Sequence, residues 1–306
     1  MKFICAQPAI PYYTWQVEIM INNFIRNGVN PNDINILCAH YGQVPPDWLK
    51  LQQHYNNVGF FFYPDTREDH FYIPSVYFNL MKQHLTAYPE LTTQPLFLHD
   101  CDIIFTRPVN FKDMEYHNTW YLSDTVGYIG YNYIFGKGED VYLDMCRVME
   151  MDPLIPRIMN PNSGGAQHIV KNTTPEYWDK VEKDSIKLYK HFCDTEPNYK
   201  GEGYAIQKWT AGMWSLLWNA WKFGHPTRVD NRLDFCWATC YIDRWNEAPI
   251  FHNAGVTEDR KDLFFKAAYF TNLPYNDVKL ENINPQSCSY KYVEELLKTK
   301  EISCLI

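Results

Sequence analysis

The sequence predicts an α/β fold with a mostly parallel sheet covered by helices on both faces. From residue 2 to residue 105, short apolar runs alternate with amphipathic stretches in the order βαβαβαβ. The apolar runs are continuous, as is typical of parallel strands buried on both sides. The chain has 306 residues, of which 46% are apolar and 17% aromatic, so it can bury a large core.

Each element of this order has its own signal. The runs KFICA, DINILCAHYG and VGFFFYPD are rich in β-branched and aromatic residues and predict three strands. The first predicted helix has apolar residues at helical spacing and ends at Gly28, and the second begins with Pro and Asp. The predicted helices cover 13–29, 45–55 and 73–88, and the fourth strand is PLFLHDCDIIF at 95–105.

The composition argues against several classes of protein. With 28 basic and 36 acidic side chains, the net charge of -8 gives no overall attraction to phosphate backbones or anionic lipids. The nine cysteines are spread singly without a CxxC pair, which indicates reduced intracellular thiols. The first apolar run ends at Gln7, too early for a signal peptide, and we see no membrane span. We therefore expect a cytoplasmic protein, in the host cytoplasm if the source is viral.

The fourth predicted strand carries two carboxylates, Asp100 and Asp102. Ligands of open α/β sheets bind at the carboxyl ends of strands, and side chains at i and i+2 of an extended chain point the same way. Such a pair can hold Mg²⁺ or Mn²⁺, which favour oxygen ligands and substrate phosphates. An isolated Asp-x-Asp is more often a turn, but the flanking apolar strand favours a metal site. GxGxxG and GxxxxGK[ST] phosphate loops are absent from the sequence.

The stretch FLHDCDIIF, after three βα units, resembles the DxD region of GT-A glycosyltransferases. In that family the motif bridges Mn²⁺ or Mg²⁺ to the diphosphate of a nucleotide sugar. NPNSGGAQHIVKN at 160–172 is similar to the family's acceptor-side strand, WTAGMW at 209–214 to its W-x-x-E-M helix, and IFHNAGV at 250–256 to its late His-x-x-Gly. The pattern is most similar to the plant hydroxyproline O-arabinosyltransferase and peptidyl-serine galactosyltransferase group.

The resemblance implies a GT-A fold, in which a Rossmann-like, mostly parallel sheet flanked by helices joins an acceptor-side mixed region. One continuous domain would contain a nucleotide-sugar half at 1–110, and an acceptor half with a closing metal and diphosphate segment at 111–306. His252 would be the third metal ligand beside Asp100 and Asp102, although a lone histidine is more often a satisfied structural residue. The expected donor is a nucleotide sugar, most simply a UDP-sugar.

Further donor contacts are implied by the same resemblance. The loop after the first strand of this fold receives the nucleotide base, so Tyr12 and Tyr13 are expected there, whereas most other aromatic residues should be core. Lys261 and Lys266 follow His252 and could neutralise a leaving diphosphate. Lys261 is the one we expect to do so, and a solvated charge on a helix is the plainer alternative.

The second half contributes candidates for the sugar and the acceptor. Adjacent glycines would let a sugar lie against the backbone between polar donors, although they could simply form a tight turn. Asp124 follows a strand-like run and could bind the donor or the acceptor, or could be a turn aspartate. The candidates are Asp124, Asn162, Gly164, Gly165 and Gln167.

Gly212 departs from the family pattern, because relatives carry the glutamate of W-x-x-E-M at this place. An inverting transfer needs a base within reach of the acceptor hydroxyl. That base would be missing, unnecessary in a retaining enzyme, or supplied by another residue. The small residue would leave room for a bulky acceptor. The alternative bases considered are Asp194, Glu196, Glu202 and Asp234.

The acceptor class stays open at this point. Hydroxymethylated cytosine in DNA is the first acceptor considered, by analogy with bacteriophage-type enzymes that glycosylate DNA bases, although the negative net charge argues against it. A cytosolic glycan or protein hydroxyl is the alternative, and a catalytically silent sugar-nucleotide-binding module is a third. Lysines at 180, 183, 187 and 190 form either a solvated helix face or a contact for an anionic acceptor.

Overall fold

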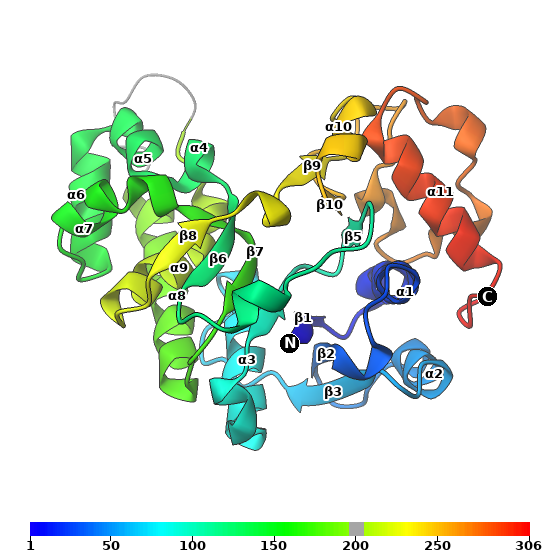
Figure 1. Cartoon of the computed structure of the whole chain (residues 1–306), viewed down its shortest axis with the longest axis horizontal. Helices are drawn as coiled ribbons and strands as arrows, with labels where there is room; N and C mark the ends of the chain where they lie inside the picture. Colours follow the sequence, from blue (N-terminus) through cyan, green and yellow to red (C-terminus); the bar gives the residue numbers. More distant parts are fainter. Residues whose placement is uncertain (196–204) are drawn as a thin grey trace. The chain divides into compact units, whose positions relative to one another are not determined.

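The computed structural model describes residues 1–195 and 205–306 and confirms the α/β class (Figure 1). The chain divides into two compact units that interleave along the sequence. Unit 1 contains 65–98 and 112–233 together with Met1, and unit 2 contains 2–64, 99–111 and 234–306. No helix of the described residues has the length and apolar character needed to cross a membrane.

Unit 2 begins with the parallel strands that the sequence predicts. β2 lies between β1 and β3 and pairs with both in parallel. Its side chains Ile34, Ile36 and Leu37 are fully buried, which explains the continuous apolar run. In chain order these elements are β1 (Lys2–Pro8), α1 (Pro11–Arg26), β2 (Ile34–His40), α2 (Pro46–His54) and β3 (Gly59–Pro64).

A second, three-stranded sheet belongs to the same unit. β10 (Ile250–His252) is its central strand, antiparallel to β5 (Ile103–Phe105) and parallel to β9 (Phe235–Trp237). The apolar side chains of β5 and of Ile250 and Phe251 are almost fully buried, so burial of apolar surface stabilises this short sheet. The unit also contains α10 (Asp243–Glu247) and α11 (Cys288–Lys300).

The prediction of a single strand at 95–105 is wrong, because the structure has two short strands in this segment. The chain forms β4 (Leu96–Leu98), turns at 99–102, and then forms β5 in the other sheet. Asp100 and Asp102 therefore lie on a turn after β4, not along an extended strand. Apolar residues on both sides of the turn hide the break, because both short strands are buried.

The strands of unit 1 pair in mixed directions. β7 lies between β4 and β6 and is antiparallel to both, whereas β8 is parallel to β6. Helix α9 buries Trp214, Trp218 and Trp221 in one hydrophobic core, to which α8 contributes Leu188 and Phe192. In chain order the remaining elements are α3 (Val76–Ala87), β6 (Trp120–Asp124), α4 (Val126–Ile129), α5 (Tyr131–Lys137), α6 (Glu139–Val148), α7 (Leu154–Ile158), β7 (Gly164–Val170), α8 (Pro175–Thr195), α9 (Ala211–Lys222) and β8 (Thr227–Val229).

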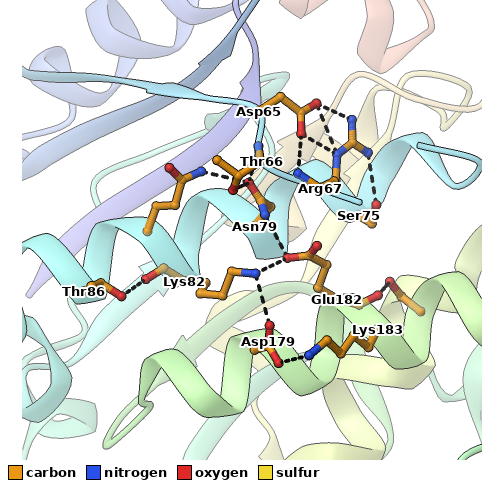
Figure 2. Close-up of polar contacts among 12 residues, drawn as sticks. Asp65, Thr66, Arg67, Ser75, Asn79, Lys82, Thr86, Asp179, Glu182 and Lys183 are labelled. Atoms are coloured by element: carbon orange, nitrogen blue, oxygen red, sulfur yellow. Dashed lines mark hydrogen bonds and ion pairs between the residues drawn. The ribbon is translucent and has the colours of Figure 1, made fainter. Parts of the chain in front are cut away.

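A polar bridge joins α3 to α8 within unit 1 (Figure 2). The buried carboxylate of Glu182 accepts hydrogen bonds from Asn79 Nδ2 and Lys82 Nζ, both at 3.0 Å. Lys82 also donates to Asp179 at 3.1 Å, and Asp179 in turn accepts from Lys183 at 2.6 Å. Because these charges pair with one another, we assign the bridge a structural role.

Candidate metal and diphosphate site

Asp100, Asp102 and His252 come together in unit 2 and form a group that could hold a metal ion. His252 Nε2 lies 3.6 Å from Asp100 Oδ2 and 3.4 Å from Asp102 Oδ1. Octahedral ligands at about 2.1 Å from an ion are about 3.0 Å apart when adjacent and about 4.2 Å apart when opposite. The observed separations lie within this range, so the two carboxylates and the imidazole fit a hard divalent cation.

The pairing of β5 with β10 fixes this arrangement. His252 is the last residue of β10 and lies opposite Ile103, and the backbone N–H of Asn253 donates to the carbonyl of Asp102 at 3.0 Å. The ring of Trp237 also stacks on the imidazole of His252, with a distance of 5.1 Å between the ring centroids. Backbone pairing and ring stacking therefore hold His252 toward the carboxylates.

The three side chains differ in exposure. The side chain of Asp100 is 56% exposed, whereas those of Asp102 and His252 are 6% and 9% exposed. Nδ1 of His252 is buried and has no hydrogen-bond partner among the described residues. The group thus has two buried side chains and one open side, formed by Asp100.

Lys266, which begins a short 3₁₀ helix (Lys266–Tyr269), adds a cation to this group. Its Nζ contacts Oδ2 of Asp102. Burial alone would raise the pKa of the Asp102 carboxyl, but Lys266 and His252 hold that pKa well below its usual range. Burial would likewise lower the pKa of Lys266, yet the carboxylate raises it above its ordinary value. Asp102 is therefore an anion at neutral pH, ready to hold a cation.

Tyr12 and Tyr13, the expected contacts of the nucleotide base, lie at the start of α1 in the same unit. Both are half-buried, with ring centroids 4.9 Å apart. Burial raises the pKa of Tyr13, and the neighbouring groups Cys101, Tyr12, Asp100 and Asp102 raise it further. Both tyrosines therefore lie within electrostatic reach of the carboxylate group, and their contact with a base stays a prediction.

The two candidate lysines have different positions. Lys261 is exposed, and its backbone N–H donates to the carbonyl of Asp259 at 3.0 Å. Lys266 contacts Asp102 instead. The sequence offered both lysines but gave no reason to prefer Lys266, because a contact across more than 160 positions leaves no local pattern. A role of Lys261 toward a diphosphate remains a prediction.

The other expected site residues lie in unit 1. Asp124 is exposed at the end of β6, and its carboxylate accepts from the backbone N–H of Val126 at 3.1 Å, as a turn aspartate does. The carbonyl of Asn162 accepts from Thr227 Oγ1 at 3.2 Å. Gln167 is buried, and its Oε1 accepts from Ser123 Oγ at 2.6 Å. Gln167 Nε2 has no partner among the described residues.

Gly164 and Gly165 have a packing explanation. Both belong to β7, opposite Asp124 and Ser123 of β6. A Cβ atom at Gly164 would lie 2.5 Å from the carbonyl oxygen of Ser123, and one at Gly165 would lie 2.6 Å from the Met213 methyl. The glycines therefore allow close strand and helix packing, and a sugar contact there stays a prediction.

The room expected beside Gly212 is absent. Gly212 is buried in α9, where a Cβ atom would lie 3.0 Å from both the Phe78 ring and the Tyr72 hydroxyl. That hydroxyl accepts from the Gly212 N–H at 2.9 Å and donates to the Trp209 carbonyl at 2.6 Å. The small residue thus accommodates aromatic packing and leaves no space for an acceptor.

The alternative bases are not distinguished by their positions. Asp194 is exposed near the end of α8, and Asp234 is paired with Arg244 at 2.5 Å. Glu196 and Glu202 lie outside the described residues. A catalytic base is therefore not assigned.

No protein-family model and no curated protein matches the sequence. Among solved structures, the chain is similar to the bifunctional glycosyltransferase WbbM, with a TM-score of 0.47 and 10% identity over 97% of this chain and 49% of WbbM. It is also similar to the galactosyltransferase LgtC in complex with donor and acceptor sugar analogues, with a TM-score of 0.44 and 11% identity over 97% and 95% of the two chains. The glycosyltransferase GlyE of Streptococcus pneumoniae TIGR4 gives a TM-score of 0.41 and 12% identity over 98% and 61%. The chain thus spans about half the length of WbbM.

Proposed function

We propose that this protein is a metal-dependent glycosyltransferase of the GT-A type, which transfers a sugar from a nucleotide sugar to a hydroxyl group. The observation that carries the proposal is the group of Asp100, Asp102 and His252 with Lys266 beside it. A donor set of two carboxylates and one imidazole, open on one side, suits Mn²⁺ or Mg²⁺ that must also accept phosphate oxygens.

The residues have distinct roles in this proposal. When bound, the metal would neutralise negative charge on the diphosphate leaving group. The buried side chains of Asp102 and His252 and the more exposed side chain of Asp100 would hold the metal. Lys266 supplies a further positive charge for the leaving group. Tyr12 and Tyr13 contact the nucleotide base, and we propose UDP as the nucleotide.

We place a glycan or protein hydroxyl ahead of hydroxymethylated DNA as the acceptor. On α8, Lys180 pairs with Asp184 at 2.7 Å and Lys183 with Asp179 at 2.6 Å, and Lys190 pairs with Asp69. Paired lysines give little net attraction for a polyanion, and the net charge of -8 adds none.

Donor hydrolysis tests the enzyme class directly. The purified protein is incubated with a panel of UDP- and GDP-sugars, with Mn²⁺, with Mg²⁺ or with a chelator, and free nucleoside diphosphate is measured. We expect slow release from at least one donor, abolished by the chelator. Donor binding without release would favour the silent binding module, and neither binding nor release would contradict the proposal.

A second panel tests the acceptor. Oligosaccharides, hydroxyl-bearing peptides and hydroxymethylated duplex DNA are offered with the active donor at two ionic strengths. Transfer to a neutral acceptor should change little with salt, whereas transfer to DNA should fall steeply because phosphate contacts release counterions. Transfer to the DNA alone would reverse the ranking proposed here.

A further inference from the structure

Lys266 contacts the carboxylate of Asp102, which is also one of the three candidate ligands of a metal ion. Its Nζ contacts Oδ2 of Asp102, while His252 lies 3.4 Å from Oδ1. Asp102 is almost fully buried, so water screens these contacts poorly. Among the described residues, the ion pairs of Asp102 are those with Lys266 and His252. The ammonium thus already supplies the counter-charge of the buried carboxylate.

A divalent cation bound to Asp102 would lie next to this ammonium, and the two positive charges would repel each other. The Lys266 side chain is 26% exposed and carries its ammonium on a flexible four-carbon stem. The ammonium can therefore move away from Asp102 without unfolding of the short helix that Lys266 begins. The ring of Tyr12, an expected contact of the nucleotide base, packs against the ring of Phe270 at a centroid distance of 5.3 Å, and Phe270 directly follows the 3₁₀ helix that Lys266 begins. A displaced ammonium is therefore close to where a donor diphosphate is expected.

We propose that Lys266 is the resident counter-cation of Asp102, that a divalent metal ion displaces it, and that the donor diphosphate then receives it. This inference rests on the proposed metal-dependent function and adds to it an order of binding, in which the metal displaces Lys266 before the diphosphate pairs with it. Metal alone binds weakly because it must displace Lys266. Metal and diphosphate together bind tightly because the displaced ammonium gains a new anionic partner, and this coupling acts equally in both directions.

Lys266→Met separates the two halves of the proposal. It removes the charge and keeps much of the apolar stem. Mn²⁺ binding to the protein without nucleotide is measured from the electron paramagnetic resonance signal of free Mn²⁺, and UDP binding is measured by equilibrium dialysis at saturating Mn²⁺. We expect Mn²⁺ to bind about tenfold more tightly and UDP about tenfold more weakly than in the wild type.

Two further variants control this result. Lys279→Met makes the same change at an exposed lysine of unit 2 and should alter neither affinity. Lys266→Arg keeps the charge and should keep metal binding weak. Circular dichroism of each variant checks the fold.

The outcomes separate this inference from the function on which it rests. Wild-type protein that binds Mn²⁺, together with Lys266→Met that binds it no more tightly, would overturn the role of Lys266 alone. Tighter Mn²⁺ binding without weaker UDP binding would overturn the transfer of the ammonium to the diphosphate. Wild-type protein that binds no Mn²⁺, with or without UDP, would overturn both the inference and the proposed function.

Discussion

The Nε2 atom of His252 lies 3.4 Å from the Oδ1 atom of Asp102. Neither position depends on the other side chain, because β5 and β10 are paired through their backbones and buried through Ile103, Ile104 and Phe251. Changes at the two polar side chains should therefore alter ion binding much more than folding.

Asp102→Asn should nearly abolish metal binding and any donor hydrolysis. The amide has the size of the carboxylate but no charge, and it leaves Lys266 without its buried partner. We expect Mn²⁺ affinity to fall by about 100-fold or more, since even groups behind metal ligands contribute 10- to 100-fold. Asp277→Asn, an exposed change in the same unit, is the matched control. Activity within a few-fold of wild type and insensitive to chelator would refute the metal assignment.

His252→Phe should weaken metal and donor binding together. Phenylalanine keeps an aromatic ring to stack on Trp237 but has no nitrogen to donate to a metal. Titrations of Mn²⁺ with and without UDP should both shift to higher concentration, and the melting temperature should stay within a few degrees. If both midpoints are unchanged, His252 is a structural residue.

Gly212→Ala should destabilise the protein without a selective effect on transfer. The new Cβ atom would press on Phe78 and on a Tyr72 hydroxyl that two hydrogen bonds hold in place. We expect a loss of about 1–2 kcal/mol in the free energy of unfolding, since overpacking costs more than a helix gains from alanine. Gly136→Ala, in α5 with nothing within 4 Å of its Cβ position, should be neutral or slightly stabilising. Normal stability with a selective loss of transfer would return position 212 to the acceptor site.

Acid should destabilise unit 1 through two buried histidines. Burial lowers the pKa of His84 and of His168 to about 4, so between pH 6.5 and 4 the unfolded chain binds more protons than the folded one. The stabilisation of the folded state that comes from this pKa difference is fully present above pH 6.5. It is lost as the pH falls toward 4, and the free energy of unfolding then decreases by up to about 3 kcal/mol for each histidine. Urea unfolding at several pH values should show this slope, and His168→Gln should reduce it. An identical slope in the variant would contradict the assignment to His168.

The sequence predicted the first half of the fold better than the second. Continuous apolar runs and proline-led helices define β1 to α3 locally, and the structure confirms them. The break after Leu98 was missed because Ile103 to Phe105 continue the apolar pattern of β4. Which sheet a short buried run joins depends on partners distant in sequence, and no local pattern records that.

The candidate site shows the same limit. Asp100, Asp102 and His252 were predicted because a motif marks each of them, and the structure brings them together. Lys266 was not preferred over Lys261, since only the folded chain brings it to Asp102. The packing that fills the space beside Gly212 was not foreseen, because its aromatic neighbours Tyr72 and Phe78 are more than 130 positions away.

The pairing of β5 with β10 also has a consequence for the order of events during protein synthesis. His252 is translated 150 residues after Asp102, which at ribosomal speeds takes about 8–30 s. During that interval the growing chain holds Asp100 and Asp102 but not His252, so the candidate metal group cannot assemble. The apolar strand Ile103–Phe105 also lacks its β10 partner over this period, and unpaired apolar strands are prone to aggregate. The nascent chain should therefore be prone to misassembly until the segment around residue 250 has left the ribosome and can pair with Ile103–Phe105.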